Sequence, residues 1–135
     1  MKIDVRFQSA LLDDDELFSR VARCLAEAAI MVNRATIRQR KAAGRPLPSV
    51  YDAGIVWEKP PDSEELIDIP TIMRRGWAHC LNLSCWRAAE LREMGIDARI
   101  HITRQHKMGA KSRLFHVLLR LPKGKTECPS KRLGM

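Results

Sequence analysis

Apolar residues recur at helical spacing through the first third of the chain, directly after an acidic run at 13–16. These apolar residues are Leu17, Val21, Leu25, Ala28 and Val32. Acidic side chains are favourable at a helix N-terminus, and this spacing places apolar groups on one helix face. Because Gly44 and Pro46 end the pattern, the sequence predicts one long helix over residues 14–42. Before it, residues 2–8 alternate polar and apolar positions, which predicts a short strand.

A second helical segment, residues 78–94, is apolar on nearly every side. Its apolar members include Leu81, Leu83, Cys85, Trp86, Ala88, Ala89 and Leu91. A helix of this kind is usually buried at the centre of a fold. Gly95 then suits the left-handed residue that commonly ends a helix. A shorter helix over 70–75, from Pro70 to the stop at Gly76, is expected just before it.

The segments after this helix are shorter and have the two-residue periodicity of strands. Strands are expected at 98–102, 114–121 and 125–128, and a loop at 105–112. A brief extended piece is also expected at 55–57. Helices followed by an antiparallel sheet indicate the α+β class. The sequence therefore predicts an α+β fold in which a central buried helix packs on a small antiparallel sheet.

The length of 135 residues suits a single domain, and 45% hydrophobic residues can form a core without metal or disulfide support. We expect one domain over residues 1–135, in which 1–50 form the N-terminal strand and long helix and 51–135 form the rest. No apolar run reaches about 18 residues, and the N-terminal stretch is not that of a signal peptide. The expected setting is a reducing cytoplasm without a membrane partner, where the four cysteines are free thiols.

The net charge of +8 is concentrated in the second half of the chain. Residues 1–70 hold 10 Lys and Arg against 12 Asp and Glu, whereas residues 71–135 hold 14 against 4. Such a basic half can attract nucleic acid or an acidic protein surface, and it can equally be a solvated face. The aromatic content of 5%, with no interleaving of basic and aromatic residues, makes nucleic acid the weaker of the partners considered.

One cysteine and one histidine have positions that suit nucleophilic chemistry. Cys80 falls in the first turn of the predicted buried helix, where the partial positive charge favours a thiolate. A thiolate nucleophile needs a base from elsewhere in the fold, and His116 lies within a predicted strand. The sequence therefore predicts that Cys80 and His116 form a nucleophile and base pair. Three further residues are expected to wall this site, namely Trp57, Trp77 and His79.

Five short segments occur in an order that is typical of one family. They are GWAHC at 76–80, AAELR at 88–92, GIDAR at 95–99, FHV at 115–117 and ECPS at 127–130. The chain resembles the transglutaminase-like superfamily, which is related to papain. In that family a cysteine opens a helix, a G-I-P-A-R-like segment follows, and a histidine strand precedes a D-P-[ST] segment. The resemblance covers about residues 51–135 and is closest to small transglutaminase-like proteins of phages and prophages.

This resemblance implies a cysteine acyl-transfer protein that acts on a protein or peptide and uses no cofactor. Cys80 would attack a carboxamide or peptide carbonyl to form a thioester, and His116 would move the proton. Water as second substrate would give a protease or deamidase, and an amine would give a cross-linker. Zinc is not expected, because the chain has no C-x2-C pair, and Cys80 and Cys85 point in different directions on a helix.

The chain departs from the family at its third catalytic position. The family has an aspartate there to orient the imidazole, whereas this chain has Cys128, and a neutral thiol does this poorly. The adjacent Glu127 cannot simply substitute, because neighbours on a strand point to opposite faces. The alternative is therefore an inactive structural or binding protein on the same fold, acting in phage particle assembly or through its basic C-terminal half.

Overall fold

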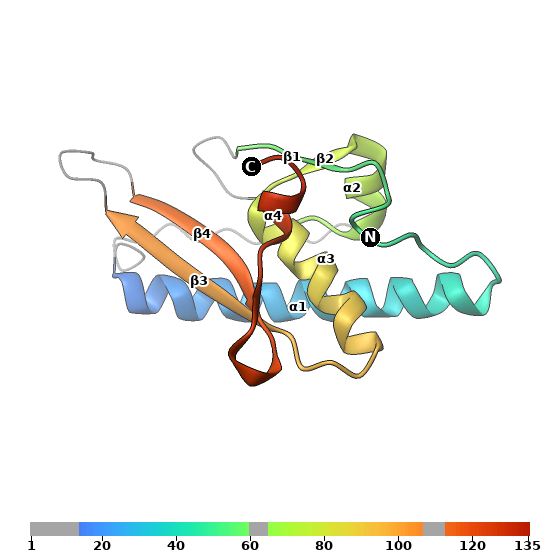
Figure 1. Cartoon of the computed structure of the whole chain (residues 1–135), viewed down its shortest axis with the longest axis horizontal. Helices are drawn as coiled ribbons and strands as arrows, with labels where there is room; N and C mark the ends of the chain where they lie inside the picture. Colours follow the sequence, from blue (N-terminus) through green and yellow to red (C-terminus); the bar gives the residue numbers. More distant parts are fainter. Residues whose placement is uncertain (1–13, 60–64, 107–112) are drawn as a thin grey trace.

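Helices and two small sheets make up residues 14–59, 65–106 and 113–135, which are the residues that the computed structural model describes (Figure 1). Their order is α1 (Asp15–Ala42), β1 (Val56–Trp57), α2 (Ile69–Arg75), β2 (Trp77–Ala78), α3 (Cys80–Glu93), β3 (Arg99–His106), β4 (Arg113–Arg120), the 3-10 turn η2 (Pro122–Gly124), β5 (Thr126–Glu127) and α4 (Pro129–Arg132). The strand predicted at 2–8 lies outside the described residues. The mixed helix and sheet content agrees with the predicted α+β class.

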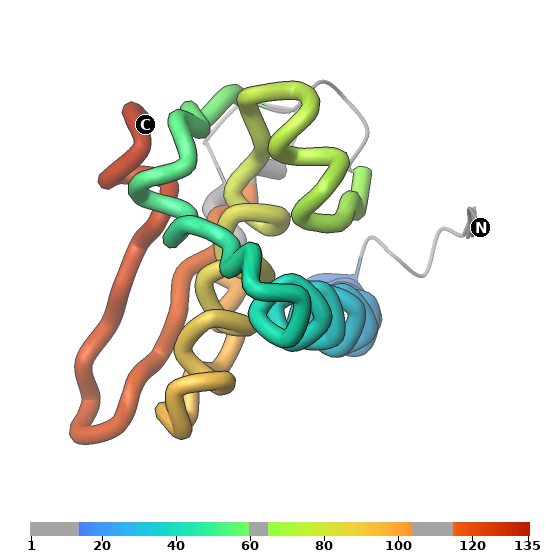
Figure 2. Tube along the Cα trace, turned by 90° about the vertical axis from the view of Figure 1, so that its right-hand side faces the viewer, coloured from blue at the N-terminus to red at the C-terminus, as the bar shows by residue number. Residues whose placement is uncertain are grey.

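The helix α3 is the centre of the fold. Figure 2 views α1 end-on and shows α3 between α1 and the C-terminal segment that carries β5 and α4. Ten residues of α3 are buried, from Cys80 through Leu91. The prediction of a central buried helix is therefore confirmed.

Two sheets flank this helix. The strands β3, β4 and β5 form an antiparallel sheet in that order, and β1 pairs with β2 in parallel. The small antiparallel sheet was predicted. The loop predicted at 105–112 was wrong at its start, because β3 continues to His106 through its pairing with β4. The structure thus lengthens the hairpin at the expense of the loop.

The buried face of α1 differs from the predicted one. Ala26, Ile30 and Asn33 are buried, whereas Val32 is 52% exposed and Cys24, which would ordinarily be a core residue, is exposed. Apolar residues occur on more than one side of α1, and its packing against α3 decides which side is covered. The sequence therefore predicted the helix correctly and its inward face incorrectly.

Local interactions at helix ends fix the approach to Cys80. The side chain of Asp68 accepts a hydrogen bond from Thr71 N at 3.1 Å and so caps α2. Gly76 then adopts φ of 79°, a left-handed conformation that ends α2 and directs the chain into β2. Since β2 leads through His79 into α3, these local signals place Cys80 at the first position of the helix.

No helix within the described ranges is both long enough and apolar enough to span a membrane.

Candidate functional site

The imidazole of His116 and the thiol of Cys128 lie in direct contact. The distance from His116 Nε2 to Cys128 Sγ is 3.1 Å, and both residues are half-buried. The register pairs Leu119 with Glu127, so the next residue, Cys128, falls on the face of the sheet from which His116 projects. The structure therefore brings together two of the three residues predicted for the catalytic positions.

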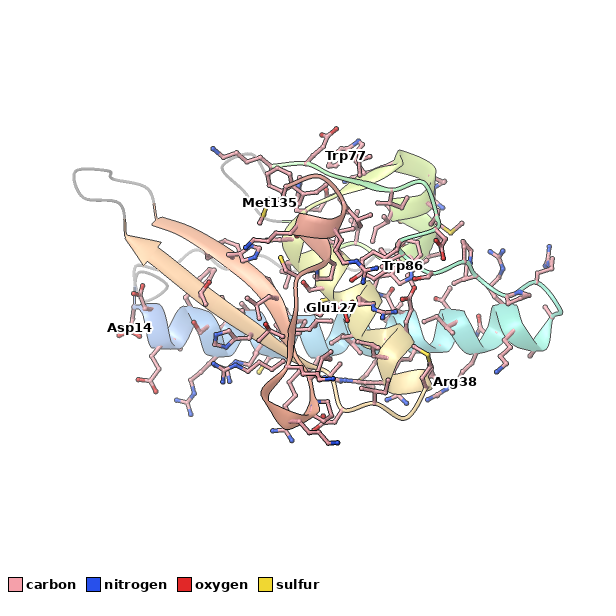
Figure 3. The ribbon with its side chains drawn as sticks, viewed as in Figure 1. Asp14, Arg38, Trp77, Trp86, Glu127 and Met135 are labelled. Atoms are coloured by element: carbon pink, nitrogen blue, oxygen red, sulfur yellow. The ribbon has the colours of Figure 1, made fainter. Side chains whose placement is uncertain are left out.

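Glu127, labelled in Figure 3, bonds to Arg87 of α3. Its carboxylate accepts hydrogen bonds from the Tyr51 hydroxyl and, at 2.7 Å, from Arg87 Nε. Arg132 also approaches it, at 3.9 Å. The expectation that Glu127 does not face the imidazole is confirmed.

The same acid belongs to a polar junction that joins three separate parts of the chain. Arg87 bridges Glu127 and Glu90, and its side chain and that of Arg132 lie over the ring of Tyr51. The pKa of the Glu90 carboxyl is raised, mainly because burial disfavours its charged form. This junction, which we call the Tyr51 junction, holds β5 against α3 and so fixes which face Cys128 occupies.

Cys80 is the first residue of α3 and is only 4% exposed. It packs in an apolar cluster that includes Val117, the neighbour of His116 on β4. The helix start carries no side-chain cap, since His79 at the cap position makes no such hydrogen bond. The approach of the Cys80 thiol to His116 stays a prediction.

The pKa of the His116 imidazole is lowered below 6.5, first because burial disfavours the charged ring and second because Lys131 is nearby. A lowered pKa keeps the ring neutral near neutral pH, so that one ring nitrogen has a lone pair. Since Cys128 contacts Nε2, Nδ1 is the nitrogen on the other side of the ring. The neutral ring can therefore accept a proton, and burial and Lys131 make it a weaker base than an exposed imidazole.

The three expected wall residues gather just before α3. Register pairs Trp57 with Ala78, and the rings of Trp77 and His79 lie 5.2 Å apart. His79 Nδ1 donates to the carbonyl of Glu58 at 2.8 Å, which joins the start of α3 to the chain after β1. These contacts give Trp77 and His79 structural roles, and their contact with a substrate stays a prediction.

Sequence reasoning did not identify the residues that orient Cys128. Tyr51 and Arg87 were missed, and so was Lys131, which affects His116. A signal for Arg87 was available, because it is a cation between the apolar pairs Cys85–Trp86 and Ala88–Ala89. Glu127 was equally conspicuous, as one of 4 acids among residues 71–135.

Among the described residues, no group of three or more His, Cys, Asp or Glu side chains is arranged to hold a metal ion. Cys24, Cys80, Cys85 and Cys128 form no disulfide bond with one another.

No family model matches the chain, and no curated protein or solved structure matches it.

Proposed function

We propose that the protein is a cysteine acyl-transfer protein of the transglutaminase-like kind, with Cys80 as nucleophile and His116 as base. The contact of 3.1 Å between His116 and Cys128 is the observation that carries the proposal. The resemblance requires the residue at position 128 to face the histidine, and this is the geometry that the side chains adopt. His116 and Cys128 are twelve positions apart, so their contact depends on the register between β4 and β5 and not on chain proximity.

The proposed chemistry uses the two ring nitrogens of His116 separately. Cys128 contacts Nε2, so Nδ1 is the atom that would take the proton from Cys80. The thiolate would attack a carboxamide or peptide carbonyl, the C–N bond would break, and the imidazolium would return the proton to the leaving amine. Backbone N–H groups at the uncapped start of α3 would stabilise the oxyanion.

The substrate class follows from this chemistry as a peptide or protein carrying an amide. Transfer of the acyl group to water would give hydrolysis or deamidation, and transfer to an amine would give cross-linking. The bacterial or host cytoplasm is the proposed setting, since a thiolate nucleophile requires a reduced cysteine. The proposal includes a phage or prophage origin of the protein, as the resemblance implies.

A second candidate is a structural or binding protein that has kept the fold without the chemistry. Two observations favour it: Cys80 is 4% exposed, and Cys128 supplies a thiol where a carboxylate would stabilise the imidazolium. A role in phage particle assembly is the proposed form of this alternative.

The alkylation rate of Cys80 as a function of pH separates these two candidates. In the enzyme, the Cys80 thiol reacts with iodoacetamide near neutral pH, and His116→Ala shifts that reactivity to higher pH. The matched control is His101→Ala, which removes another imidazole of the same sheet. If the alkylation profile gives Cys80 the pKa of an ordinary thiol, about 8.5, in both the wild type and His116→Ala, the result supports the binding protein.

A further inference from the structure

A hollow of about 420 Å³ lies between α1 and the strand ends at the base of the β3–β4 hairpin. Figure 1 shows the hairpin crossing α1 in this part of the molecule. The lining residues are Arg23, Glu27, Arg99, Ile100, His101 and Arg120. None of them belongs to the proposed acyl-transfer site, so this hollow is a separate feature of the surface.

Positive charge dominates the lining. Arg23, Arg99 and Arg120 contribute three guanidinium groups, and Glu27 is the single carboxylate. The charge of Glu27 is already matched, because both of its oxygens accept hydrogen bonds from Arg92, at 2.6 and 2.8 Å. Because Glu27 is paired with Arg92, the lining offers no other carboxylate to Arg23, Arg99 and Arg120.

Arg99 has a partner outside the hollow. Its side chain pairs with Asp97 at 3.1 Å, and both side chains are largely exposed. An exposed ion pair of this type contributes little free energy. A stronger anion can therefore take over the guanidinium of Arg99 without a large cost.

His101 is in direct contact with one of these arginines. Arg120 Nη2 lies 3.3 Å from His101 Nε2, and a guanidinium nitrogen can only donate. The imidazole is therefore the acceptor in this contact, in its neutral form with the proton on Nδ1. The pKa of His101 is lowered, first by burial and then by the charges of Arg120 and Arg23.

We propose that this hollow binds a phosphate group, held by Arg23, Arg99 and Arg120 beside His101. The planar fork of a guanidinium matches the oxygens of a phosphate, and charge-assisted hydrogen bonds of this type are about twice as strong as neutral ones. No Phe, Tyr or Trp is among the lining residues, so we expect the ligand to be recognised by its phosphate and not by stacking of a base.

The proposal goes beyond the acyl-transfer function and does not depend on it. A phosphate can come from a small phosphorylated molecule or from the backbone of a nucleic acid. The two sources share the same contacts in the hollow. They differ in affinity, because a polyanion also gains from the basic residues around the hollow.

The test is an NMR titration that follows the imidazole protons of His101 at constant ionic strength. The probes are inorganic phosphate, a nucleoside monophosphate and a single-stranded oligonucleotide, each added to the full-length protein. The His101→Gln variant identifies the signal among the four histidines. We expect a saturable shift with phosphate and a rise in the midpoint of the His101 titration, because a bound anion favours the imidazolium.

The variant pair Arg99→Gln and Arg120→Gln, made together, should weaken phosphate binding by about tenfold or more. The control combines Arg40→Gln with Arg74→Gln, which removes the same charge from exposed positions on α1 and α2. Equal affinity for phosphate and oligonucleotide would assign a small phosphorylated ligand, and tighter oligonucleotide binding that the variant abolishes would assign a nucleic acid backbone. A wild type without a saturable shift, or a control that loses as much affinity as the variant, would overturn the proposal.

Discussion

The Sγ of Cys128 lies 3.1 Å from Nε2 of His116, in the position from which an acid would orient the ring. A thiol and a carboxylate differ in this position by more than charge. A carboxylate can only accept from the imidazole, and it stabilises the imidazolium, whereas a neutral thiol is a weak donor and a weak acceptor. His116 therefore has, at Nε2, a partner that stabilises the charged ring poorly.

Restoring the acid should strengthen the site. We expect Cys128→Asp to accelerate alkylation of Cys80 by at least about tenfold near neutral pH, because the carboxylate stabilises the imidazolium that forms as the thiol ionises. The measurement is the rate of iodoacetamide labelling at Cys80, mapped by peptide mass in a Cys24→Ser background. Cys128→Asn is the control of equal size without charge, and equal acceleration by both variants would contradict the prediction.

Lys131 should control the ionisation of His116. Its charge and the burial of the ring both lower the pKa of His116 below 6.5. The neutral ring is thus favoured by folding, so this contribution to stability is present above pH 6.5 and is lost as the pH falls toward the lowered pKa. In an NMR titration, Lys131→Gln should raise the midpoint of His116, and Lys125→Gln, in the turn before β5, should leave it unchanged.

That prediction separates the two causes of the shift. If Lys131→Gln leaves the midpoint where it is in the wild type, burial alone lowers the pKa and the lysine has no part in it. The same spectra give the midpoint in Cys128→Ala, in which the ring loses its Nε2 partner.

Glu127 should be essential to stability and not to proton transfer. Glu127→Gln removes the charge that Tyr51 and Arg87 share, and we expect a loss of about 2–4 kcal/mol in the free energy of unfolding. The measurement is urea unfolding followed by circular dichroism. Glu65→Gln breaks an exposed pair with Arg75 and should cost less than about 1 kcal/mol. Similar losses for the two variants would show that the Tyr51 junction is no stronger than a surface ion pair.

The four thiols should differ in accessibility. Cys24 is exposed and Cys128 is half-buried, whereas Cys85 is fully buried and its pKa is raised, mainly by that burial. We expect Cys24 to react first with a thiol reagent under native conditions and Cys85 only after unfolding. Peptide mapping of the labelled protein checks this order, and early labelling of Cys85 in the folded protein would contradict its place in the core.

The elements that the sequence predicted well are those with local causes. The ends of α2 and α3 coincide with Gly76 and Gly95, which adopt φ of 79° and 80°, where side chains other than glycine are strained. The apolar residues of α3 lie on most of its sides, which made its burial predictable.

The features that escaped prediction depend on contacts between distant residues. The inward face of α1 is chosen by α3, so Asn33 could be buried, with its Oδ1 accepting from Ile69 N at 3.1 Å, although its type favours the surface. Tyr51 and Glu127 are 76 positions apart in the chain, and no local pattern connects them. The helix α4 is a single turn of four residues that starts at Pro129, too short to give a periodic signal.

For His116 and Cys128 the order of segments was enough to suggest their meeting. The alternation of side chains along a strand also predicted that Cys128, and not Glu127, turns toward the ring, whereas the residues that bind Glu127 on the other side were not predicted. That choice follows from the single-residue alternation of β5 and from the guanidinium of Arg87, which holds the glutamate on the other side.

Tyr51 is the one tyrosine of the chain, so the absorbance of tyrosinate reports on the surroundings of this residue alone. Its pKa is raised above 10, first by burial and then by the hydrogen bond to Glu127, so the phenol resists ionisation in alkali for as long as the C-terminal segment is docked on α3. When that segment separates, the phenol meets solvent and ionises as an ordinary tyrosine. The ultraviolet absorbance of tyrosinate in mild alkali therefore measures, without any label, the fraction of molecules in which the C-terminal segment carrying Cys128 has separated from α3.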